Sequence, residues 1–194
     1  MSGIEFLGIC KAMRGRMGVG RYRHCAGVAR MAERLAVRHR SSPLKARLAG
    51  VLHDVARTWT GDALIAYADE HAMPITEDAR RAPVLLHAAV GADIAKREYG
   101  IHDPDVLGAI VHHTVAGPNM SDLEKIVYMA DTFEPSRAFE GREALEAAAF
   151  RSLDEGLLAC LRESMKYLSS KRIAVAQETT QLYDDLVKRN AGTP

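Results

Sequence analysis

The stretch VLHDVA at residues 51–56 places a histidine and an aspartate side by side within an apolar run. The apolar residues Leu44, Leu48 and Val51 recur with the spacing of one buried helix face. An ionised carboxylate is strongly destabilising when it is buried without a partner. Asp54 must therefore reach water or lie beside a cation, and the rest of the sequence has to indicate which.

Helical periodicity extends over nearly the whole chain, and no segment alternates convincingly in the manner of a β-strand. Residues typical of helix starts precede several apolar stretches: Ser42 with Pro43, Thr60, Asp103 with Pro104, and a capping box of Ser121 and Glu124. Gly100 is typical of a helix end. We predict an all-α fold, with one long amphipathic helix over residues 145–168 and a last helix around residues 180–187.

The chain has the length of a single domain, which we place at residues 21–187. Residues 1–20 are expected to be a lead-in and residues 188–194 a tail. The sequence GRMGVGR of residues 15–21 resembles a phosphate loop only superficially, because it lacks the Lys-Ser/Thr ending of a Walker loop and no strand precedes it. We interpret it as a flexible lead-in to the first helix.

The composition is that of an ordinary globular protein, with 47% hydrophobic and 26% charged residues in a chain of 194. A formal net charge of +1 gives no overall field that would favour a nucleic-acid or membrane partner. The three cysteines are odd in number and form no CxxC pair, which favours reduced thiols and a cytoplasmic location. Nothing in the sequence indicates an oligomeric state.

Polar residues that lie on or beside apolar stripes share the context of His53: His24, Asp54, His87, His113 and Asp131. Three other histidines lie among polar residues and are expected to be solvated: His39, His71 and His102. His112 adjoins His113, and neighbouring helical residues point about 100° apart, so the two are not expected to face one centre.

Two interpretations of this set remain open on residue types alone. A single histidine on an apolar face is usually a core imidazole with its own hydrogen-bond partner, and the two aspartates could pair with Arg57 and Lys125. A divalent cation would instead satisfy all of these groups at once. Imidazole and carboxylate ligands suit zinc, iron, manganese or cobalt and do not choose among them.

The order of these residues and their flanking sequences carry a family resemblance. The segments are RYRHCAGVA (21–29), AGVLHDVAR (49–57), LLHAAVGA (85–92), HHTVAGPNMSDLEKIVYMADTFEPSR (112–137) and SLDEGLLACL (152–161). They resemble the HD-domain metal phosphohydrolase superfamily and, within it, the YqeK-type symmetrical diadenosine tetraphosphatases of bacteria. The resemblance implies a helical HD-domain bundle with a helical C-terminal extension.

The resemblance also implies roles for individual residues. The expected metal ligands are His24, His53, Asp54 and Asp131. His87 and His113 would line the phosphate site, either as ligands of a second metal or as donors to phosphate oxygens, and together with Asp54 they are the expected catalytic residues. The positions expected at the phosphate end of the nucleotide are Arg21, Thr114 and Arg137. In this family the metal is usually iron, and manganese or cobalt can replace it.

The implied reaction is symmetrical hydrolysis of diadenosine tetraphosphate to two ADP by a metal-activated water. Two departures from the family pattern concern substrate contacts: HTVAGP follows the last histidine where HTTG is common, and Ala176-Gln177 stand where His-Pro is usual. Arg137 could alternatively form a helix-end ion pair with Glu134 or Glu140. The alternatives in function are hydrolysis of another nucleotide or phosphate ester, a nucleotide-binding module with a structural metal, and a metal-free scaffold.

Overall fold

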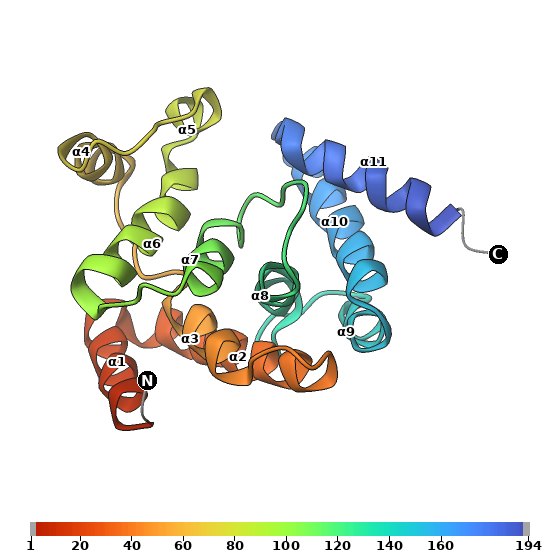
Figure 1. The fold of residues 1–194 in the computed structure, drawn as a ribbon. Coiled ribbons are helices and arrows are strands. Elements are labelled where there is room, and N and C mark those ends of the chain that lie inside the picture. The colour runs from red at the N-terminus through yellow and green to blue at the C-terminus, as the bar shows by residue number, and fades with distance from the viewer. Residues whose placement is uncertain (1–2, 192–194) are drawn as a thin grey trace.

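The computed structural model describes residues 3–191, which form eleven α-helices and one short 3₁₀ helix and contain no strand (Figure 1). The all-α prediction is therefore confirmed. The elements are α1 (Gly3–Arg16), α2 (Gly18–Arg38), α3 (Pro43–Leu52), α4 (Gly61–Glu70), α5 (Glu77–Arg81), η1 (Pro83–Leu85), α6 (Leu86–Tyr99), α7 (Pro104–Val111), α8 (Asp122–Phe133), α9 (Arg142–Arg151), α10 (Leu153–Ser170) and α11 (Gln177–Ala191).

The helices begin where the sequence places their capping residues. Ser42 accepts a hydrogen bond from the backbone N–H of the third residue after it, and Thr60 does the same at the start of α4. Asp103 caps α7, and the capping box of Ser121 and Glu124 is complete. These bonds satisfy backbone donors that the first turn of a helix leaves free.

The first twenty residues correct the sequence prediction, because residues 3–16 form α1 and α2 already begins at Gly18. Four side chains of this segment are buried in the core at helical spacing: Phe6, Ile9, Met13 and Met17. We did not predict this apolar stripe because the glycines of the segment favoured a flexible lead-in. At the other end, α11 continues past residue 187 to Ala191, so the first part of the expected tail is helical, and residues 192–194 lie outside the described range.

Two further helix boundaries differ from the prediction. The helix that carries VLHDVA ends at Leu52, so His53 and Asp54 lie in the turn that follows it rather than in its middle. The long helix expected over residues 145–168 is two helices, α9 and α10. It is broken because Ser152 has an extended backbone (φ −148°, ψ 137°) and its hydroxyl caps α10.

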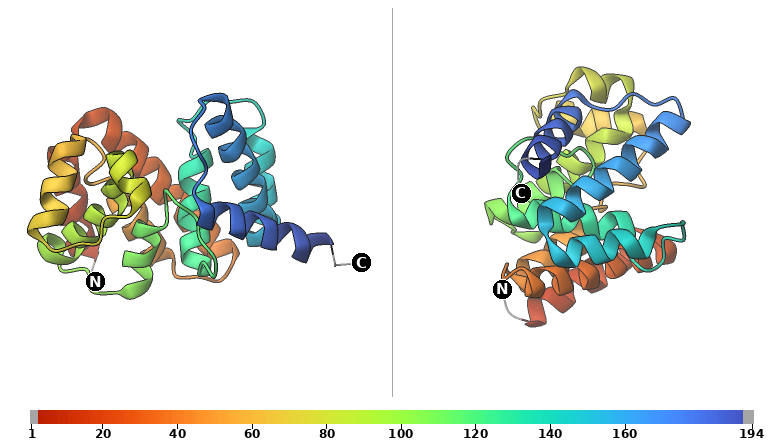
Figure 2. Two further views of the ribbon diagram at one scale, coloured as in Figure 1. Left: turned by 90° about the horizontal axis from the view of Figure 1, so that it is seen from above. Right: turned by 90° about the vertical axis from the view of Figure 1, so that its right-hand side faces the viewer.

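The centre of the molecule is the packing of α2 against α3, with α7 and α8 beside them. Helices α4 and α5 lie on one side and the C-terminal helices α10 and α11 on the other (Figures 1 and 2). Helices α2 and α3 approach closely because Gly50 has no side chain: a Cβ atom there would lie 2.7 Å from the Cα of Ala29. This close contact brings the residues of α2 near the turn after α3.

Among residues 3–191, no helix is both long and apolar enough to cross a membrane. The division of the chain into residues 21–187 as one domain stays a prediction.

Candidate metal centre

Side chains from five segments converge near the middle of the molecule. His24 comes from α2, His53 and Asp54 from the turn after α3, and Asp131 from α8. His87 lies in the first turn of α6, and His113 lies in the turn after α7. The structure thus brings together all six side chains that the sequence selected as possible metal ligands.

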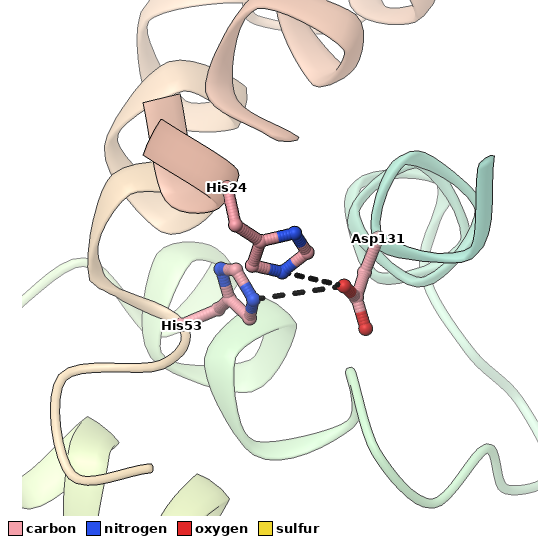
Figure 3. Close-up of side chains that lie close together, drawn as sticks. All are labelled: His24, His53 and Asp131. Atoms are coloured by element: carbon pink, nitrogen blue, oxygen red, sulfur yellow. Dashed lines mark ion pairs between the residues drawn. The ribbon is translucent and has the colours of Figure 1, made fainter. Parts of the chain in front are cut away.

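One group of donor atoms consists of His24, His53 and Asp131 (Figure 3). Asp131 Oδ1 lies 3.0 Å from Nε2 of His24 and 3.8 Å from Nε2 of His53. Oδ2 of Asp54 lies next to the same two imidazoles, 3.7 Å from Nε2 of His24 and 3.4 Å from Nε2 of His53. Imidazole nitrogens and carboxylate oxygens at such separations could surround a divalent ion.

A second group lies on the other side of the same carboxylate. Oδ1 of Asp54 is 3.4 Å from Nε2 of His87 and 3.6 Å from Nε2 of His113, and these two nitrogens are 3.1 Å apart. The hydroxyl of Thr114 is 3.0 Å from Nε2 of His113. Asp54 therefore faces both groups, one with each carboxylate oxygen, and could contribute a ligand to either.

The outer nitrogens of the histidines fix which nitrogen faces the centre. His53, His87 and His113 each direct Nδ1 at the backbone carbonyl three residues earlier, of Gly50, Val84 and Ile110 respectively. A carbonyl oxygen only accepts, so Nδ1 carries the hydrogen in each ring. Nε2 is therefore the nitrogen directed at the centre, and a ring that has lost its Nε2 proton offers a lone pair there, as a metal ligand requires.

The electrostatics of the site also favour a cation. Burial raises the pKa of Asp54 and of Asp131, but the surrounding imidazoles outweigh it, joined at Asp131 by Arg137, and hold both pKa values far below the usual range. Burial lowers the pKa of His53, while the carboxylates of Asp54 and Asp131 raise it to about 9. Nε2 of His24 and of His53 are buried, and neither makes a hydrogen bond of good geometry, although carboxylate oxygens of Asp131 and Asp54 lie beside them. Ionised carboxylates beside buried imidazole nitrogens are a donor set that a divalent ion satisfies.

Comparison with known proteins decides the family. The HD domain family matches residues 21–136, a segment that contains every side chain of both donor groups. This chain belongs to the HD domain family.

Two named relatives and one solved structure are similar over most of the chain. The symmetrical bis(5'-nucleosyl)-tetraphosphatase of Bacillus subtilis is 35% identical, over 86% of this chain and 89% of that protein. The enzyme of the same name from Halalkalibacterium halodurans is 34% identical with the same coverage. A crystal structure from Clostridium acetobutylicum, described as a predicted HD superfamily hydrolase involved in NAD metabolism, has a TM-score of 0.90 and 35% identity, covering 95% of this chain and 97% of that one.

Two arginines contact the carboxylates of the donor groups. Arg21 contacts Oδ2 of Asp54 at 2.7 Å, and Arg137 contacts Oδ1 of Asp131 at 2.7 Å. Both arginines line an open cavity of about 270 Å³ next to His24. The ion pairs expected as alternatives to phosphate and metal binding are wrong. Arg137 pairs with Asp131 rather than with Glu134 or Glu140. The cation beside Asp54 is Arg21 rather than Arg57.

Most of the polar residues that were not expected to be ligands have partners outside the two donor groups. Lys125 pairs with Asp154 at 2.7 Å, as a structural ion pair, and His112 pairs with Glu124 at 2.7 Å. His102 is exposed as expected. His39 and His71 are half-buried instead of solvated, because each ring bonds a backbone carbonyl, of Ala149 and Tyr67 respectively.

Two residues close to the centre were missed by sequence reasoning. Glu134 is 1% exposed and lies 3.1 Å from Nδ1 of His24. The sequence shows only that Glu134 precedes Pro135 near a predicted helix end, which does not indicate a buried carboxylate. Cys25 lies close to His53 and Asp54, and burial and the Asp54 carboxylate raise the pKa of its thiol.

Proposed function

We propose that this protein hydrolyses diadenosine tetraphosphate symmetrically to two ADP, with a water activated by a divalent metal. The observation that carries the proposal is the Asp54 carboxylate, which faces one donor group with each of its oxygens in a chain whose relatives bear the name of this activity. Hydrolysis of a phosphoanhydride at such a site is the chemistry for which two adjacent cation positions are suited.

The residues proposed to hold the first ion are His24, His53, Asp54 and Asp131. His87 and His113 face the other oxygen of Asp54 and are proposed for a second ion. Burial lowers the pKa of His113, which favours a neutral ligand over a charged imidazolium donor. Mixed imidazole and carboxylate donors suit iron, which we propose first, and also manganese or cobalt. Such an ion lowers the pKa of a bound water from 15.7 to about 7.

The chain's own side chains would position the phosphates. Arg21 and Arg137 line the same cavity, and each guanidinium can hold a phosphate through two parallel N–H bonds. Replacing their aspartate partners by phosphate oxygens would place a central phosphorus beside Asp54. The hydroxyl of Thr114 lies next to both His87 and His113 and can donate to an oxygen of the leaving ADP. Neutralising the oxygens in this way is the main protein contribution to phosphoryl transfer.

The test is product analysis. Purified protein is incubated with diadenosine tetraphosphate and Mn²⁺, or anaerobically with Fe²⁺, and the nucleotides are separated by anion-exchange chromatography. We expect ADP alone. A mixture of AMP and ATP would reject symmetrical cleavage. Turnover of other nucleotides or phosphate esters, with none of diadenosine tetraphosphate, would favour the broader phosphohydrolase assignment.

The cytoplasmic location stays a prediction.

A further inference from the structure

We propose that Glu134 is a positioning residue that holds the His24 ring so that its Nε2 is available to a metal. The inference rests on the proposed metal site and assigns to it a residue outside the ligand set. Nδ1 of His24 lies 3.1 Å from Oε1 of Glu134, while Nε2 of the same ring lies 3.0 Å from Asp131. Figure 3 shows one ring nitrogen of His24 directed at Asp131 and the other directed away from it.

His24 needs this partner because of its place in a helix. His53 and His113 each donate to one of the last carbonyls of α3 and α7, which a helix leaves free at its C-terminal end. His24 lies inside the long helix α2, where the preceding carbonyls are already engaged in the helix. An acceptor from elsewhere in the chain is therefore required to fix the ring, and Glu134 supplies it.

The carboxylate of Glu134 is itself held in place. The backbone N–H of Ser136 donates to Oε2 at 2.9 Å, and the hydroxyl of Ser136 donates to Oε1. Gly27 lies one turn after His24 on α2, and a Cβ atom there would overlap Oε2 of Glu134. The absent side chain at position 27 thus leaves the space that the carboxylate occupies. A carboxylate that accepts the outer N–H of a ligand imidazole fixes its tautomer and raises its basicity.

The same chain contains a matched structural counterpart. Glu124 also accepts from a histidine Nδ1, that of His112, and from the backbone N–H of a serine, Ser121. A glycine, Gly108, likewise makes room for its carboxylate. The two networks have the same chemistry, but only the network of Glu134 includes a histidine that faces the donor atoms. Glu134 also lies near Arg137 in the same cavity, so an effect specific to Glu134 is assigned to His24 when the His24 ring itself changes with it.

The experiment compares Glu134→Gln with Glu124→Gln. Both substitutions keep the size of the side chain and remove its charge. Mn²⁺ affinity is measured by competition with a fluorescent chelator, and thermal unfolding is recorded without metal to compare the structural costs. We expect Glu134→Gln to weaken Mn²⁺ binding about 10- to 100-fold, and Glu124→Gln to leave it within about twofold of the wild type.

A second measurement reports on the ring itself and does not depend on activity. Ring ¹⁵N–¹H spectra of the metal-free protein should show His24 protonated at Nδ1 in the wild type and in Glu124→Gln, and a changed Nδ1 and Nε2 pattern in Glu134→Gln. Equal Mn²⁺ affinity of Glu134→Gln and wild type, or equal weakening by both substitutions, overturns the inference while leaving the proposed function intact. A wild type that binds no Mn²⁺ or Fe²⁺ overturns the proposed metal chemistry and this inference with it.

Discussion

Asp54→Asn is the substitution for which the structure predicts the largest functional effect, because it removes the charge that both donor groups share. Unit charges 4 Å apart interact by about 4 kcal/mol at an effective dielectric constant of about 20, and by about twice that when one of them is a divalent ion. The amide oxygen of asparagine still faces the centre, and the half-buried Arg21 can turn to water. We therefore expect about half of this interaction to be lost, roughly 4 kcal/mol or about 10³-fold in metal affinity.

The assay has two parts, Mn²⁺ affinity by chelator competition and ADP formation from diadenosine tetraphosphate at saturating Mn²⁺. The Mn²⁺ affinity should fall by about 10³-fold. Turnover should remain low even at saturating Mn²⁺, because excess metal refills the site but does not restore the negative charge of Asp54. Asp103→Asn is the control, because asparagine caps a helix as well as aspartate does and Asp103 lies at the start of α7. If Asp54→Asn bound Mn²⁺ as the wild type does and kept its turnover, Asp54 would not be the shared ligand.

Three other outcomes are expected. Gly50→Ala should lower the free energy of unfolding by about 1–3 kcal/mol, because its Cβ would meet the backbone of Ala29; denaturant titration measures this. Thr179→Val should lower kcat several-fold with little change in KM, since the Thr179 hydroxyl donates at 2.8 Å to the carbonyl of Ala116, in the loop that follows His113 and Thr114. Removing the metal with a chelator should lower the melting temperature, because a ligand that binds only the folded state stabilises it. The free energy of unfolding lost in this way is about 2.7 kcal/mol when the metal was present at 100 times its Kd, and it grows with that metal concentration.

Matched variants exist for two of these predictions. Gly8→Ala lies in α1, where a Cβ atom meets nothing within 4 Å, so it should raise the free energy of unfolding by about 0.5–1 kcal/mol. Thr180→Val removes a hydroxyl that bonds only within its own segment, to the carbonyl of Ala176, and should leave kcat unchanged. A Gly50→Ala protein as stable as wild type would contradict the close packing of α2 on α3. Equal effects of the two threonine substitutions would contradict a role for the loop contact.

Local signals in the sequence were sufficient for several helix starts and for selecting the six candidate donor residues. Ser42, Thr60, Asp103 and the Ser121 capping box predicted helix starts correctly, since a capping bond involves only neighbouring residues. The six donor side chains were found because a polar group on an apolar stripe needs a partner. Their mutual arrangement depends on five segments meeting in space, and residue spacing alone contains no such information.

The residues that the sequence did not reveal depend on tertiary contacts. Glu134 follows the end of α8, where a carboxylate is ordinarily exposed, and only the space beside Gly27 makes it buried. The break at Ser152 was missed because the leucines on both sides continue one apolar pattern. His53 and Asp54 were expected inside a helix for the same reason. The apolar pattern continues past Leu52, and it does not show where the helical backbone hydrogen bonds end.

The donor side chains differ in how they are anchored, and this difference has a consequence for their dynamics. His24 lies in the interior of the 21-residue helix α2, whereas the other five donors lie in the first or last turn of a helix or just past its end: His53, Asp54, His87, His113 and Asp131. Helix ends fray at a much lower free energy than helix interiors open. The apparent Kd of a site rises in proportion as its competent conformation becomes less populated. His24 is therefore the most firmly anchored donor of the centre. Mild heating or denaturant should loosen the donors at helix ends before it moves His24, while the protein is still folded.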